Sequence, residues 1–148
     1  MNMENKKLLQ QAITLHQQKN ISAAKKIYEE ILQTDKTFAD AWYLLGLIAL
    51  TEEDLANAEN LLLQALKIKP KQIEYLNIIG FILLKKNNLN KSLEYLDKAV
   101  QINPEQPISY LNKGLVYQQL NDNQNAVNCY LQTLKYQPEN IDALNNME

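Results

Sequence analysis

Arginine is absent from this chain, and glycine occurs only three times in 148 residues. All fifteen basic residues are therefore lysines, which carry a point charge and lack the planar fork that binds phosphate or carboxylate through two hydrogen bonds. The net charge is −2, and no long run of like charge occurs. We therefore predict no nucleic-acid partner and no binding to an acidic membrane surface.

Cysteine and histidine each occur once, as Cys129 and His16. A histidine and cysteine metal cluster therefore cannot form within one chain, and the two residues stand too far apart in sequence to suggest a nucleophile and its base. The three glycines are isolated from one another, which excludes a glycine-rich phosphate loop. We predict no catalytic residue, no metal, no cofactor and no enzymatic activity.

Long apolar runs are also missing. The first residues, MNMENKKLLQQ, have no apolar core after the lysines, and no window approaches the roughly 18 apolar residues of a membrane span. A single cysteine cannot form an internal disulfide, which fits a reducing compartment. These features predict a cytoplasmic protein without a signal peptide or membrane insertion.

The rare residues share one period. The glycines recur every 34 residues, and so do three of the four prolines: Gly46, Gly80 and Gly114; Pro70, Pro104 and Pro138. Further columns follow the same spacing: Trp42, Leu76 and Tyr110; Ala58, Ser92 and Ala126; Leu62, Leu96 and Tyr130. The spacing predicts a single array over residues 1–148, with repeats at 5–38, 39–72, 73–106 and 107–140 and a partial fifth repeat at 141–148.

Each repeat reads as two helices. In the second repeat, apolar or small residues recur at the i, i+3, i+4, i+7 spacing of one helical face: Trp42, Leu45, Gly46 and Ala49. First helices are predicted at 5–18, 39–51, 73–86 and 107–120. The second helices should start after one column of capping residues: Asn20, Asp54, Asn88 and Asp122. No useful stretch alternates with period two, so we predict an all-α protein.

Glycine inside an apolar helix costs about 1 kcal/mol relative to alanine. The recurrence of glycine at the position of Gly46 indicates a role in packing, because a residue without a side chain lets the second helix of the repeat approach closely. Neighbouring repeats can then bury their apolar faces only against each other, which predicts an α-solenoid.

Trp42, Leu45 and Gly46, followed by Ala49, Ala58, Leu62 and Pro70, resemble the tetratricopeptide repeat, a helix-turn-helix unit of 34 residues. The resemblance covers residues 5–148. A few positions depart from the family pattern: Gln11, Ala12, Lys36, Ser92, Lys113 and Thr133. The resemblance implies a right-handed superhelix whose first helices line a concave groove for peptides or partner proteins, and it implies no catalysis.

The predicted groove is apolar. Residues opposite the packed stripe of each first helix should face its open side, and contiguous exposed apolar patches usually mark contact sites. The predicted partner-binding residues are Tyr43, Leu47, Leu50, Asn77, Phe81, Leu84, Leu111, Asn112, Leu115 and Gln119. The favoured hypothesis is a protein-protein interaction scaffold that binds a peptide or partner segment through these side chains.

Two alternatives remain open. The N-terminal sequence also resembles the repeats that precede bacterial glycosyltransferase, methyltransferase or sulfotransferase domains, which would make the chain a substrate-recruiting arm. The chain could instead be a structural protein that self-associates through its repeats.

Overall fold

The computed structural model describes residues 2–148, and all regular structure in this range is helical. The helices are α1 (Met3–Gln17), α2 (Ile21–Thr34), α3 (Ala39–Thr51), α4 (Leu55–Ile68), α5 (Ile73–Lys85), α6 (Leu89–Ile102), α7 (Pro107–Gln119), α8 (Asn123–Tyr136) and α9 (Ile141–Asn146). The four predicted first helices correspond to α1, α3, α5 and α7, and every boundary agrees within two residues. The predicted all-α class is confirmed.

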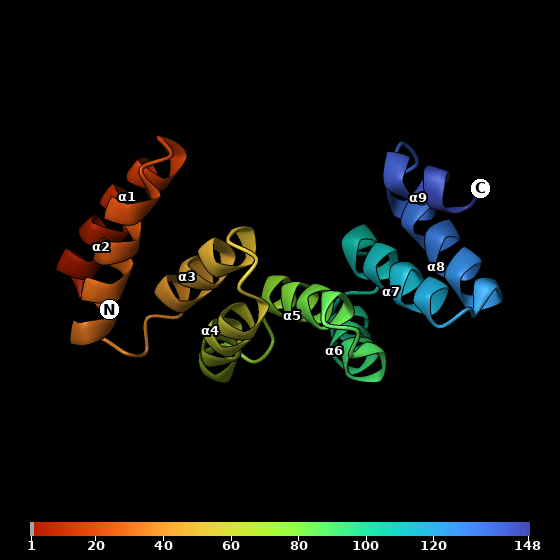
Figure 1. Ribbon diagram of the computed structural model, residues 1–148, viewed down its shortest axis with the longest axis horizontal. Coiled ribbons are helices and arrows are strands. Elements are labelled where there is room, and N and C mark those ends of the chain that lie inside the picture. The colour runs from red at the N-terminus through yellow and green to blue at the C-terminus, as the bar shows by residue number, and fades with distance from the viewer. Residues whose placement is uncertain (1) are drawn as a thin grey trace. The chain divides into compact units, whose positions relative to one another are not determined.

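The helices fall into two compact units. Met1–Pro70 contains α1 to α4, and Lys71–Glu148 contains α5 to α9. Within each unit, the first and second helices of a repeat lie side by side as antiparallel pairs (Figure 1). The sequence predicts a single array, and the boundary between the units falls after Pro70, two residues before the end of its second predicted repeat.

Every second helix begins directly after its predicted capping residue. Asn20, Asp54 and Asp122 each accept a hydrogen bond from the main-chain amide three residues later, at 3.4, 3.2 and 3.2 Å. This bond satisfies one of the amides that a helix start leaves without a partner. Asn88 holds the same position before α6, but its side chain makes no such bond.

The glycines meet the second helix of their own repeat. A Cβ atom on Gly80 would lie 2.6 Å from the side chain of Leu96, which is fully buried. Gly46 faces Leu62 and Gly114 faces Tyr130 at similarly close range. The prediction that Gly46 lets the second helix approach is therefore confirmed, and the same reason holds in all three repeats.

The turn before each capping residue contains one left-handed position. Lys19, Glu53, Asn87 and Asn121 have φ angles of 64°, 60°, 61° and 61°. Asparagine tolerates this conformation better than most residues, whereas lysine and glutamate are strained by their Cβ atoms. The turns of the first two repeats therefore carry strain that the later turns reduce.

We predict that Glu53→Gly stabilises the protein by about 1 kcal/mol, because glycine adopts a left-handed φ without steric cost. Urea unfolding followed by circular dichroism measures the change. Asn87→Gly is the matched control in the equivalent turn, and its gain should be smaller. An equal gain in both variants, or none in Glu53→Gly, would contradict the strain argument.

Candidate functional site

In the first unit, the predicted contact residues lie along one helix. Tyr43, Leu47 and Leu50 are carried by α3, and all three are half-buried. Each leaves part of its apolar side chain accessible. Their role in partner binding stays a prediction.

In the second unit, four predicted contact residues line one cavity of about 460 Å³: Phe81, Leu84, Leu115 and Gln119. Phe81 and Leu84 come from α5, and Leu115 and Gln119 come from α7. Asn146 of α9 also lines the cavity, so it is built by two successive first helices and the end of the partial fifth repeat. Its volume lies in the range of pockets that hold small molecules or partner side chains, about 300–1,000 Å³.

Polar groups border this cavity. Lys85 holds its Nζ atom 5.4 Å from the centre of the Phe81 ring, which is cation–π geometry. Gln118 also lines the cavity, and its Oε1 atom accepts a hydrogen bond of 2.6 Å from the hydroxyl of Tyr130. Lys85 is the one charged residue among the described residues that line the cavity, so the formal charge of the lining is positive.

The expectation that all predicted contact residues are exposed is wrong for two leucines. Leu84 is 5% exposed and belongs to a core cluster with Leu96 and Val116. Leu111 is 6% exposed because it packs in a cluster that includes Ala143 of α9. Leu84 still contributes to the cavity wall, whereas Leu111 is buried in a core cluster with Ala126, Tyr130 and Ala143.

The same expectation is wrong for Asn77 and Asn112, which are 5% and 6% exposed. The hydroxyl of Ser109 donates a hydrogen bond of 2.8 Å to Oδ1 of Asn77. Asn112 in turn donates through Nδ2 to the main-chain oxygen of Asn77, at 3.5 Å. These hydrogen bonds join α5 to α7 inside the protein, so the polar groups that form them are engaged within the chain. The sequence contains one indication of these bonds: Ser109 and Asn112 stand 32 and 35 residues after Asn77, which is close to the length of one repeat.

The residues considered for catalysis have structural surroundings. Cys129 is buried, and burial raises the pKa of its thiol, which lowers the fraction of reactive thiolate. His16 places Nδ1 3.4 Å from the hydroxyl of Tyr28, with the two rings edge to face. Among residues 2–148, no group of three or more histidine, cysteine, aspartate or glutamate side chains is arranged to hold a metal ion. No helix in that range has the length and apolar character of a membrane span.

Three family models match consecutive parts of the chain. They are described as tetratricopeptide repeat at residues 15–80, TPR repeat at 80–121, and tetratricopeptide repeat at 108–140. The chain belongs to the tetratricopeptide-repeat family. The matches run from 15 to 140, so they include the last three residues of α1 and all of α2 to α8.

One curated relative aligns with most of the repeat array. The BBSome complex member BBS4 of Bos taurus is 30% identical over 122 residues, which are 82% of this chain and 23% of BBS4. This chain therefore spans about a quarter of that curated relative.

Two solved structures share the fold. MamA from Desulfovibrio magneticus RS-1 superposes with a TM-score of 0.89 at 18% identity, covering 99% of this chain and 83% of MamA. YrrB, described as a TPR protein with an unusual peptide-binding site, has a TM-score of 0.81 at 21% identity. That match covers 95% of this chain and 72% of YrrB.

The hydrogen bond that holds Gln118 at the cavity depends on a neutral Tyr130. Burial raises the pKa of Tyr130 from 10.0 to about 12. The unfolded chain ionises this tyrosine near pH 10, so the folded state loses relative stability as the pH rises from about 10 towards 12. Below pH 10 this contribution is fully present.

We therefore predict that one of the eight tyrosines ionises near pH 12 in the ultraviolet absorbance titration of the folded protein. Tyr130→Phe should remove this step and leave the steps of the other tyrosines. A titration in which Tyr130→Phe removes a step near pH 10 would contradict the burial argument.

Proposed function

We propose that this chain is a protein-interaction scaffold that holds a partner segment on its first helices and has no catalytic activity of its own. The cavity formed by Phe81, Leu84 and Leu115 is the observation that carries the proposal. Membership of the family and the fold shared with YrrB support it, since YrrB is described as binding peptide.

The cavity favours a partner segment with an apolar anchor. Phe81 and Leu115 are half-buried apolar side chains, and a few such anchors usually dominate the energy of an interface. Gln118 and Gln119 offer amide groups at its edge, which suit hydrogen bonds to a main chain. Tyr43, Leu47 and Leu50 in the first unit are proposed contacts of the same kind. Self-association is the alternative outcome if no peptide binds.

We predict that Phe81→Ser weakens peptide binding at least about ten-fold, because it removes the aromatic wall of the cavity. Phe81 is half-buried, so the variant should lose only about 1–2 kcal/mol of folding stability. Peptides selected from a random library on the natural chain serve as probes, with affinities measured by fluorescence anisotropy.

Leu96→Ser is the control, because Leu96 is fully buried and its loss should cost about 3–5 kcal/mol. Gln119→Glu is a second cavity variant, and its exposed side chain should leave the melting temperature unchanged. Peptides that bind Phe81→Ser and Gln119→Glu as tightly as the natural chain would overturn the site. If selection yields no peptide and light scattering shows concentration-dependent growth of the natural chain, self-association replaces the proposal.

A further inference from the structure

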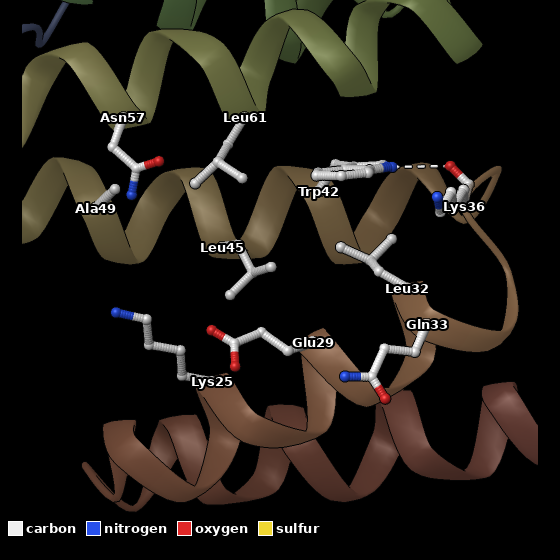
Figure 2. A pocket seen from close by; sticks show the side chains of 10 residues that line it. All are labelled: Lys25, Glu29, Leu32, Gln33, Lys36, Trp42, Leu45, Ala49, Asn57 and Leu61. Atoms are coloured by element: carbon white, nitrogen blue, oxygen red, sulfur yellow. Dashed lines mark hydrogen bonds between the residues drawn. The ribbon is translucent and has the colours of Figure 1, made fainter.

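A second cavity, of about 450 Å³, lies within the first unit. Figure 2 shows side chains of α2 and α4 facing each other across α3, which contributes Trp42, Leu45 and Ala49. The indole Nε1 of Trp42 donates a hydrogen bond of 2.8 Å to the main-chain oxygen of Lys36, which fixes the ring at one end of the cavity. None of these residues belongs to the predicted groove.

The cavity lies over the smallest residue of its column. Position 49 corresponds to Leu15, Leu83 and Tyr117 in the other three repeats, whereas this repeat has alanine. Ala49 is 2% exposed and lines the cavity. The space that a leucine or tyrosine would occupy is therefore left open in the second repeat.

The second unit shows how the equivalent place is occupied. Its cavity is smaller, about 370 Å³, and four of its seven lining residues stand two repeats after residues that line the first: Lys113 for Leu45, Tyr117 for Ala49, Asn125 for Asn57 and Cys129 for Leu61. There Lys113 Nζ lies 2.8 Å from Asp97 Oδ1. Burial by itself would lower the pKa of Lys113, but the hydrogen bond to Asp97 raises that pKa above its usual value. The ammonium is thus favourably paired there.

Glu29 is the counterpart of Asp97 in the first unit, two repeats earlier, and it lines the open cavity. Leu45 stands at the position that corresponds to Lys113, so this position provides no ammonium group in the first unit. The nearest equivalent, Lys25, has its Nζ atom 3.9 Å from Glu52. Within residues 2–148, Glu29 makes no ion pair. Lys25 and Lys36 also line the cavity, but neither forms an ion pair with Glu29. The first unit therefore has an unpaired carboxylate, and Ala49 leaves open the space that the ring of Tyr117 fills in the second unit.

We propose that this cavity binds a segment of a partner protein that presents a leucine- or tyrosine-sized side chain next to an ammonium or guanidinium group. The apolar side chain packs on Ala49 and Leu45, and the cation pairs with Glu29. A tyrosine hydroxyl would reach the polar end of the cavity, where Gln33 and Lys36 lie. The occupant supplies the two groups that Tyr117 and Lys113 supply from within the chain in the second unit.

Trp42 is the only tryptophan in the chain, so its fluorescence reports on this cavity alone. The minimal probe is tyramine, which combines a phenol ring with an ammonium, and the comparison compound is 4-hydroxyphenylacetate, which carries a carboxylate instead. We expect tyramine to bind with a dissociation constant on the order of 1 mM, as befits so small a ligand. Its carboxylate counterpart should bind at least about five-fold more weakly, because Glu29 repels it.

Two pairs of variants locate the site. Ala49→Tyr and Ala49→Leu fill the cavity with residues found at the same place in other repeats, and both should abolish binding, while Ala56→Leu on the exposed face of α4 should not. Glu29→Gln should remove the preference for tyramine, while Glu30→Gln removes one exposed charge from the same helix and should preserve it. Unchanged binding by a folded Ala49→Leu variant, or an equal preference in Glu29→Gln and Glu30→Gln, would overturn the proposal.

A peptide distinguishes a protein partner from a free amine. The probe is an alanine-based helical peptide with one tyrosine and a lysine four residues later, so that both side chains share one face. It should bind at least about five-fold more tightly than the same peptide with glutamate in place of lysine. Binding of tyramine without any binding of the peptide would overturn the assignment to a protein partner. The site proposed at Phe81 lies in the other unit, so either proposal can fail alone.

Discussion

The close approach of two helices within each repeat is the constraint on which the rest of the structure depends. Gly80 meets Leu96 at a distance that leaves no room for a Cβ atom, and Gly46 and Gly114 do the same with Leu62 and Tyr130. A glycine in a helix is unfavourable by itself. Here its cost is offset by burial of a large side chain in the facing helix, because each of those three partners is at most 1% exposed.

The short turn between the two helices serves the same approach. The left-handed residue, such as Glu53, reverses the chain within three residues, and the next residue caps the second helix. A strained φ in two of the four turns is tolerated because the helix pair behind it is buried and capped. The turn geometry is thus set by packing, and the residue types at the left-handed position differ in how much strain they carry.

Much of the fold followed from the sequence because its determinants are local and repeated. Helix starts at Asn20 or Asp54 and the facing of Gly46 depend on residues within one repeat. The candidate site was harder to predict, because the burial of Asn77 and Leu111 depends on neighbouring helices. A helical wheel for α5 alone leaves Asn77 open, whereas Ser109 and Asn112 of α7 close over it. To predict the site, one would have needed the contacts between residues about one repeat apart, and the pattern of a single helix does not contain these contacts.

Equivalent positions allow a repeat protein to vary its binding chemistry without altering its fold. The glycine and its large partner are kept in the last three full repeats, so the helix pair stays constant while the residues around it change. In the fourth repeat, Tyr117 and Lys113 line the cavity and Lys113 pairs with Asp97. In the second repeat, Ala49 and Leu45 leave space beside Glu29. Because neither change touches the packed glycine, a cavity can open or close at little cost to the array. Side-chain size and charge at equivalent positions therefore decide whether a repeat fills its own cavity or leaves a cavity suited to a partner.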